Sequence, residues 1–316
     1  MVYRPWTGRK VGVEMEMNRY TVEGGELAAS TIQRALRNAH LPVGTQPVGY
    51  YHSNGSTWDV KTDASCGWEV ATDAFMLDEQ GHNAQLMAGC AALTALHPQI
   101  NRSCGLHVHV DVRDYTWREL QALLRLWVRY EPVWFELTPP GRRSNSYCAP
   151  LRRSKWTGTD HQYYASYVQP ALTASNEDSF NRYVREIAGM RGALNLTHWF
   201  FNHRIEFRLH SGTVNYDKIR RWIMLLCTIV QRAKNHGSAP INPMGRPPQA
   251  GLPTDYLGKV LGLVESSYAP EPADESAELI LWIERRRQQF GARTTREQTE
   301  APQPRDGAEE SEYVDR

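Results

Sequence analysis

The stretch HRIEFRLHSGT, residues 203–213, decides the fold class because its side chains alternate in character. In a β-strand, side chains two residues apart point to the same face of the sheet. One face of this strand would be apolar, with Ile205, Phe207 and Leu209. The other face would carry a carboxylate between two guanidinium groups, followed by an imidazole: Arg204, Glu206, Arg208 and His210. The pattern therefore predicts a strand with one face on the core and a polar face opposite.

Two other stretches repeat this design, VGVEMEMN at residues 11–18 and GLHVHVDV at residues 105–112. The first places two carboxylates, Glu14 and Glu16, opposite valine and methionine side chains. The second places His107, His109 and Asp111 opposite leucine and valine side chains. If the three strands share one sheet, their polar faces would form a surface able to hold metal ions and polyphosphate.

The rest of the chain predicts an α+β protein. Apolar periodicity indicates helices at residues 26–40, 84–97, 175–190, 216–235 and 274–290. Thr116 and Glu119 have the spacing of a capping box and predict a helix over 116–131. Strands are expected at 56–62 and 67–72, with a hairpin of 193–201 and 203–210 around Asn202. Residues 42–56 and 139–170 have the composition of loops.

Domain boundaries follow from changes in composition. Residues 1–236 are expected to form the catalytic domain, and residues 237–290 a proline-rich linker with a C-terminal helix. Residues 291–316 lack apolar periodicity, which predicts a disordered tail.

Composition excludes several classes of protein. Of 316 residues, 41% are hydrophobic, enough for a large core, and a net charge of +1 does not indicate nucleic acid as a partner. No apolar run approaches the roughly 20 residues that span a bilayer, and the N-terminus lacks a signal-peptide pattern. We therefore expect a cytoplasmic protein without a membrane partner. Free thiols are expected because the cysteines are scattered: Cys66, Cys90, Cys104, Cys148 and Cys227.

Each candidate site residue has a functional and a structural interpretation. Glu14 and Glu16 would lie about 7 Å apart on one strand face and could bind hard cations, or they could form a solvated face. His107 and His109 are also compatible with zinc, but no third soft ligand has an obvious spacing, although Cys104 is near. The pair Glu206 and Arg208 could hold a cation and a phosphoryl group, or form a salt bridge.

Two further segments carry polar candidates. Lys61, Asp63 and Glu69 lie in WDVKTDASCGWEV, which can also be a hairpin with ordinary turn chemistry. The segment from Arg142 to Cys148 could be a phosphate or substrate clamp or a solvated basic loop. An acidic substrate would suit its cationic side chains: Arg142, Arg143, Arg152, Arg153 and Lys155. Cys148 could act as a nucleophile, but the sequence shows no activating partner.

Taken in order, the segments GVEMEMN, WDVKTDASCGWEVAT, CGLHVHVD, RRSNSYC, ALNLTHW and RIEFRLHSGT resemble the amidoligases of the glutamine synthetase and γ-glutamylcysteine ligase superfamily. The resemblance covers roughly residues 10–235. It implies a curved, mostly antiparallel sheet with a catalytic concave face and helices on the other face. It also implies that ATP phosphorylates a carboxylate and that an amine then displaces phosphate to form an amide, with magnesium or manganese ions on the phosphates.

The resemblance also implies residue roles. The metal ligands would be Glu14, Glu16, Glu69, His107 and Glu206, with the roles of His107 and His109 open to exchange. The nucleotide and its phosphates would contact His109, Lys61 and Arg204, and the transferred phosphoryl group would contact Arg208. The chemistry of the reaction adds Asp63 as a candidate to bind or deprotonate the amine, and the segment RRSNSYC adds Arg143, Asn145 and Tyr147 as candidate substrate contacts.

Other functions remain open at this stage. The same metals could serve a hydrolase that uses a metal-bound water, which would need no ATP. An inactive ligase fold could bind nucleotide without turnover. The carboxylate and amine substrates, an amino acid, peptide, protein or modified nucleotide, are not specified, and a homo-oligomer is open. Because clustered carboxylates repel one another, Glu206→Gln is expected to preserve the fold and to stabilise the metal-free protein.

Overall fold

The computed structural model describes residues 2–45, 57–143, 145–151, 164–187, 191–235, 253–265 and 271–291. In these residues, seven strands form one open sheet in the order β2-β3-β1-β5-β7-β6, with β4 paired to the start of β1. All the pairs are antiparallel. The strands are β1 (Lys10–Asn18), β2 (Asp59–Asp63), β3 (Gly67–Ala71), β4 (Phe75–Met76), β5 (Gly105–Asp111), β6 (Leu194–Asn195) and β7 (Arg204–Ser211).

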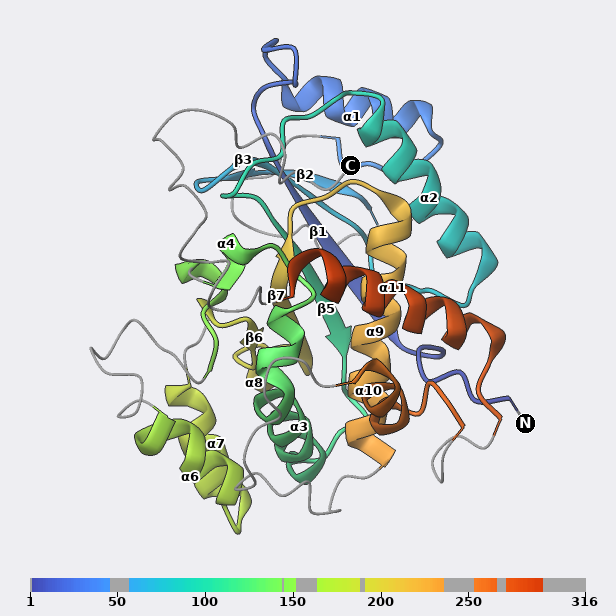
Figure 1. Ribbon diagram of the computed structural model, residues 1–316. Helices are drawn as coiled ribbons and strands as arrows, with labels where there is room; N and C mark the ends of the chain where they lie inside the picture. The colour runs from blue at the N-terminus through green and yellow to red at the C-terminus, as the bar shows by residue number, and fades with distance from the viewer. Residues whose placement is uncertain are drawn as a thin grey trace, which may run out of the picture.

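Of the longer helices described, six lie close to the segments where the sequence predicts a helix, and α10 (Thr254–Leu261) lies in the segment expected to be linker. The six are α1 (Ala29–Asn38), α2 (Gln80–Thr94), α3 (Trp117–Phe135), α7 (Glu177–Glu186), α9 (Tyr216–Asn235) and α11 (Asp274–Phe290). The α+β class is therefore confirmed. Figure 1 shows α2, α9 and α11 together on one side of the sheet. No helix in the described part of the chain is long and apolar enough to cross a bilayer.

The predicted alternation places one face of the sheet in the core. Val13, Met15, Val108 and Phe207 are almost completely buried. The ring of Phe207 lies 5.2 Å from that of Trp127 in α3. Helices therefore cover the apolar face, and the polar side chains of β1, β5 and β7 lie opposite.

His210 is an exception to the predicted alternation. The pairing of β5 with β7 is irregular between Leu106 and Val108, and two residues of β7 lie opposite His107 there. Such a bulge shifts the strand by one position. His210 therefore lies on the helix face, with its ring 5.0 Å from Trp222 and its Nε2 3.3 Å from Arg286 Nη2.

Some boundaries differ from those expected. Helix α7 begins after Asn176, not at Ser175, because the Asn176 side chain accepts a hydrogen bond from Ser179 N. The expected hairpin around Asn202 contains a short helix, α8 (Trp199–Asn202), before β7. Residues 139–170 are not all loop, since the described part includes α4 (Pro140–Arg143), η1 (Ser146–Cys148), η2 (Tyr164–Val168) and the start of α6 (Gln169–Thr173). The expected linker at 237–251 and the tail at 292–316 lie outside the described residues.

Helix α11 contributes to the same core although it follows the linker in sequence. The Trp282 ring lies 6.3 Å from that of Trp222, and Arg286 Nε donates a hydrogen bond to the carbonyl of Leu137. Ile283 is completely buried.

We expect Ile283→Ala to lower the free energy of unfolding by about 2–5 kcal/mol, because it leaves a cavity in a packed core. Leu281→Ala is the matched control on the same helix, since Leu281 is 51% exposed. Its effect should stay within about 0.5 kcal/mol. Urea denaturation measures both, and equal effects would mean that α11 does not share the core.

Candidate active site

Strand register arranges the polar side chains into three rows across one face of the sheet. Directly opposed residues are close neighbours in an antiparallel pair, and successive rows are about 7 Å apart. The first row crosses β6, β7, β5 and β1 and contains Asn195, Glu206, His109 and Gly12. The second contains His107, Glu14 and Ala71. The third contains Glu16, Glu69 and Lys61. Residues far apart in sequence therefore meet at one place.

The four carboxylates of these rows are buried, each no more than 8% exposed: Glu14, Glu16, Glu69 and Glu206. Lys61 forms ion pairs with two of them, at 3.3 Å from Glu14 and in closer contact with Glu69. Arg208 pairs with Glu206. Lys61 and Arg208 thus balance part of the negative charge of these carboxylates. Lys61, for which a phosphate contact is expected, forms ion pairs with Glu14 and Glu69 in this structure.

The histidines of β5 lie among these carboxylates. His107 Nδ1 is 3.3 Å from Glu14 Oε2, and its Nε2 is 3.4 Å from Glu16 Oε1. His109 Nε2 is also 3.3 Å from Glu14 Oε2. Among the described residues, three sets of ligand atoms lie close enough to share an ion. They are Glu14 with Glu69 and His107, Glu14 with His109 and Glu206, and Glu16 with Asp63 and Cys66. Oxygen and imidazole donors of this kind fit a divalent metal.

The surroundings of each carboxylate determine its charge. Burial, reinforced by the negative charge of Glu14, raises the pKa of Glu69 to about 7. Burial also opposes ionisation of Glu14, but His109 and the hydrogen bond with His107 outweigh it and hold the pKa of Glu14 well below its usual range. The pKa of Glu206 is lowered in the same way, despite burial, by His109 and Arg208. Glu69 is therefore the carboxylate that gains a proton first.

The bulge in β7 positions Arg208. Arg142, a buried residue of α4, donates hydrogen bonds to the carbonyls of the two bulge residues, Arg208 at 2.6 Å and Leu209 at 3.0 Å. Arg208 Nε donates to the carbonyl of Tyr147 at 3.1 Å. The Arg208 guanidinium is thus held from both sides beside Glu206.

The segment that follows α4 is only partly arranged as expected. Arg143 donates a hydrogen bond to the carbonyl of Phe290 in α11, and neighbouring Arg142 is the arginine that reaches the site. The two differ because consecutive helical residues point about 100° apart. Asn145 Oδ1 accepts a hydrogen bond from Tyr147 N, and the Tyr147 side chain is 46% exposed. Arg152, Arg153 and Lys155 lie outside the described residues.

Two sulfur and carboxylate groups have structural roles. Asp63 Oδ1 accepts hydrogen bonds from Ser65 N and Cys66 N and closes the turn between β2 and β3. These bonds lower the pKa of Asp63 although burial opposes them, which makes Asp63 an anion and a weak base. Cys148 is completely buried, and burial raises the pKa of its thiol, so it does not have the properties of a nucleophile. All five cysteines are free thiols, as expected.

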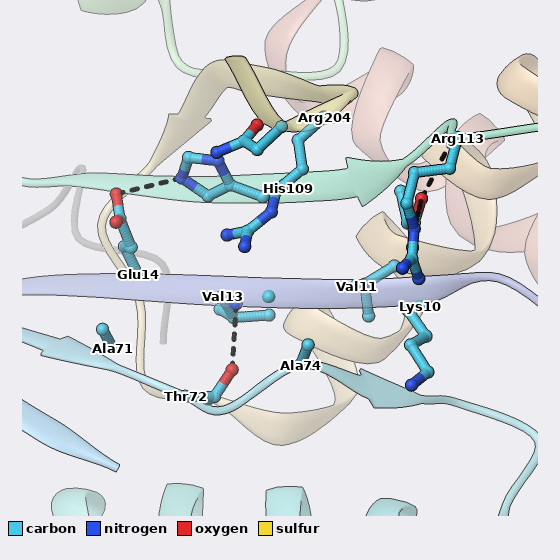
Figure 2. Close-up of a pocket in the computed structure, with 13 residues that line it drawn as sticks. Lys10, Val11, Val13, Glu14, Ala71, Thr72, Ala74, His109, Arg113 and Arg204 are labelled. Carbon is cyan, nitrogen blue, oxygen red and sulfur yellow. Dashed lines mark hydrogen bonds and ion pairs between the residues drawn. The ribbon is translucent and has the colours of Figure 1, made fainter. Parts of the chain in front are cut away.

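A cavity of about 400 Å³ adjoins the carboxylates at the start of β1. Figure 2 shows Glu14 and His109 at one end and Arg204 on the wall, with Ala71 and Ala74 on the opposite side. Gly12 also lines the cavity, so no side chain fills the space beside His109. The basic residues of its wall are Lys10, Arg113 and Arg204. Such a cavity has the size of known small-ligand sites.

Two residues at the site, Asn195 and His198, were not among the expected ligands or substrate contacts, and Arg142 was expected only as part of a basic loop. Asn195 Nδ2 donates a hydrogen bond to Glu206 Oε2 at 2.8 Å. His198 Nε2 lies 3.7 Å from the same oxygen, and Arg142 supports the bulge. Burial, followed by the charge of His109, lowers the pKa of His198. Once the strand register is known, the alternation of side chains places Asn195 opposite Glu206. No local pattern in the sequence indicates that His198 lies at the site.

Gly105 permits the close approach of three side chains. A Cβ added at Gly105 would lie 2.9 Å from His107 Nε2, 3.3 Å from Glu16 Oε2 and 3.4 Å from Arg142 Nη2. Its amide also donates a hydrogen bond to Glu16 Oε2 at 2.5 Å. A side chain here must therefore displace groups of the site.

We expect Gly105→Ala to weaken Mn²⁺ binding by at least about 10-fold, the effect of disturbing groups that orient metal ligands. Titration calorimetry measures the affinity. Gly81→Ala is the control, because nothing lies within 4 Å of the added Cβ and its backbone also allows alanine. Unchanged Mn²⁺ affinity in Gly105→Ala would show that His107 and Glu16 do not hold the ion.

The fold and the buried carboxylate–imidazole rows define an α+β protein whose polar sheet face carries groups that could hold a metal ion. Residues 7–230 match the family described as "putative amidoligase enzyme", and the chain belongs to this family. A search of curated proteins finds no match to the chain. The family indicates an enzyme that forms amide bonds, and therefore substrates with carboxylate and amine groups.

Proposed function

We propose that the protein is an ATP-dependent carboxylate–amine ligase that acts through an acyl phosphate. One observation supports this proposal most strongly. Four buried carboxylates, two histidines and Arg208 converge on one sheet face, beside a cavity with basic residues on its wall. The family supports amide formation, and the convergence supports the use of metal ions and a polyphosphate.

The charges of the site suit the electrostatic requirements of this reaction. ATP is highly anionic and its acceptor is a carboxylate, so positive charge must bring them together. When bound, Mg²⁺ or Mn²⁺ would neutralise these charges. The residues placed to hold such ions are Glu14, Glu16, Glu69, His107 and Glu206. We assign the cavity to the nucleotide, with His109 and Arg204 towards its phosphates.

The proposed reaction has two steps. A carboxylate oxygen of the substrate attacks the γ-phosphorus of ATP, and ADP leaves. The ammonium group of the second substrate loses a proton to solvent. The neutral amine nitrogen then attacks the acyl carbon, the bond to the phosphate oxygen breaks, and phosphate leaves with the second proton of the nitrogen. Arg208 would stabilise charge on the transferred phosphoryl group, while anionic Asp63 would hold the incoming amine as an ammonium ion. Asn145 and Tyr147 lie beside Arg208 and would contact the carboxylate substrate.

Hydroxylamine tests the proposal without knowledge of the natural amine, because it converts acyl phosphates to hydroxamates. The protein is incubated with ATP, Mg²⁺, hydroxylamine and pooled amino acids and dicarboxylic acids. We expect ADP and hydroxamate in equal amounts, both dependent on ATP. Amide cleavage that needs metal but no ATP would instead identify a hydrolase. Nucleotide binding without hydroxamate for any acid, including peptide carboxylates, would identify an inactive binding module.

A further inference from the structure

Helix α11 lies beyond residues 7–230, which match the family, yet it contacts the strand that carries Arg208. Arg286 is a buried arginine of this helix, only 4% exposed. Its Nε donates a hydrogen bond to the carbonyl of Leu137 at 2.8 Å, and its Nη2 lies 3.3 Å from His210 Nε2. Arg286 therefore connects the end of α3 to β7 on the helix face of the sheet.

The hydrogen bonds of His210 show how Arg286 holds the ring. A guanidinium group can only donate, so His210 Nε2 accepts the hydrogen bond from Arg286. The proton of the neutral ring is then on Nδ1, which donates to the carbonyl of Ser211 at 2.6 Å. Both ring nitrogens of this completely buried side chain are satisfied. Because a buried polar group without a partner is unfavourable, Arg286 makes the helix face a favourable place for His210.

His210 reaches this place only through the bulge in β7. Phe207 pairs with Val108 and His210 with Leu106, which leaves Arg208 and the next residue opposite a single residue of β5. In a regular strand, alternation would put His210 on the polar face with Arg208. The bond from Arg286 to His210 therefore favours the bulged register over the regular one.

The bulge fixes the backbone from which the Arg208 side chain extends. Arg208 N donates a hydrogen bond to the carbonyl of Ala193 at 2.9 Å, and Arg142 donates to the carbonyl of Arg208 at 2.6 Å. Arg143, beside Arg142 in α4, donates to the carbonyl of Phe290 at the end of α11. Helix α11 thus contacts both the strand that carries Arg208 and the segment that supports its bulge.

We propose that Arg286 is a positioning residue, which holds the bulged register of β7 and so directs Arg208 towards the reacting groups. Its effect on the rate rests on the proposed ligase function, whereas its effect on the register does not. Arg286 is on the helix face and is not among the residues that line the cavity. It can still affect the reaction, because a misplacement of about 1 Å caused by a distant change can cost about 100-fold in rate.

Hydroxamate kinetics test the action through Arg208. Arg286→Gln should lower kcat by about 10- to 100-fold with little change in the Kd for ATP. In an Arg208→Ala background, Arg286→Gln should have no further effect on kcat, because no guanidinium remains to be positioned. Ile283→Ala is the matched control: Ile283 is buried in the same helix, and its loss should leave the kcat of the folded protein unchanged. An equal loss in Ile283→Ala, or an undiminished effect of Arg286→Gln without Arg208, would overturn the proposal.

Two variants of His210 test the same contact from the strand side and do not alter Arg286. His210→Gln keeps an acceptor near the position of Nε2 and should retain most of the wild-type kcat. His210→Leu removes the acceptor and should reproduce the loss of about 10- to 100-fold. Thermal unfolding verifies that both variants are folded. A wild-type kcat in folded His210→Leu would contradict the proposal.

Hydrogen exchange measures the register without any activity. The protein is studied by mass spectrometry in the absence of nucleotide and substrate. Arg286→Gln should speed amide exchange in residues 208–211 by at least about 10-fold, the loss expected for one hydrogen bond from a charged group. Strands β2 and β3, at the other end of the sheet, should exchange as in the wild type. Unchanged exchange in residues 208–211 would overturn the proposal. If the wild type forms no hydroxamate, the ligase proposal fails, and the exchange result alone decides whether Arg286 holds the register.

Discussion

Replacing Arg208 with alanine is expected to slow hydroxamate formation by roughly 100- to 1000-fold, with little change in the Kd for ATP. The guanidinium lies beside Glu206 on the polar face, and burial does not prevent the nearby carboxylates from raising the pKa of Arg208. It is therefore a permanent positive charge in a fixed place. Charge moves onto the phosphoryl oxygens only during transfer, so the interaction is stronger in the transition state than in the ground state. The loss should appear in kcat.

The variant Arg208→Lys tests whether a positive charge is sufficient at this position or whether the planar guanidinium is also needed. The guanidinium of Arg208 bonds Glu206 and the Tyr147 carbonyl at once, and a lysine ammonium cannot reproduce this planar arrangement. We expect Lys to recover less than a tenth of the lost rate. Arg221→Ala is a suitable control, since Arg221 pairs with Asp217 on α9 and lines neither the cavity nor the carboxylate rows. If Arg208→Ala raised only the Kd for ATP at unchanged kcat, Arg208 would bind nucleotide and would not act on the transferred group.

Two glutamine substitutions should change the stability of the metal-free protein in opposite directions. The pKa of Glu69 is raised to about 7 by burial and by Glu14, so its ionised form is unfavourable in the folded state. Glu69→Gln should therefore stabilise the protein at pH 8 by on the order of 3 kcal/mol. Lys61 keeps Glu14 as a partner in this variant. Glu206→Gln should destabilise the protein by about 1–3 kcal/mol, because buried Arg208 and Asn195 lose an ionised acceptor.

The pH dependence provides a check on the Glu69 effect. Between its unfolded pKa near 4.5 and its folded pKa near 7, Glu69 retains a proton only in the folded protein. Its contribution to stability is therefore complete below pH 4.5 and is lost as the pH rises through 7. Urea denaturation with a chelator at pH 4.5 and pH 8 should show a gain for Glu69→Gln only at pH 8. An equal gain in stability at both pH values would mean that the changed shape of the side chain, not its lost charge, stabilises the protein.

The structure changes the expectation for Glu206→Gln that the sequence alone gives. Repulsion among clustered carboxylates predicts that Glu206→Gln stabilises the metal-free protein. In the structure, Arg208 and His109 hold the pKa of Glu206 below its usual range, so its ionised form contributes to stability. Glu69 is the carboxylate whose ionised form is made unfavourable by burial and by the negative charge of Glu14. The sequence indicates a cluster of carboxylates. The groups that surround each carboxylate determine which one is unfavourable in its ionised form.

The sequence by itself determined the sheet and the face on which the site lies. Side-chain direction alternates strictly along a strand, so the patterns around Glu14, His107 and Glu206 indicate one polar face without any knowledge of pairing. The capping box at Thr116 and the apolar stripe of residues 216–235 likewise depend on neighbours in sequence, and α3 and α9 follow them closely. Local periodicity was sufficient for these elements.

Only the tertiary structure decided which polar residues meet and which leave the site. The bulge opposite His107 moves His210 to the helix face, because one extra residue reverses the alternation. The order β2-β3-β1 brings Lys61 to both Glu69 and Glu14. The fold of the β6–β7 connection brings His198 to Glu206, and Arg142, not Arg143, reaches the bulge. Each outcome depends on how the segments pair and turn in the folded chain, which side-chain alternation does not encode.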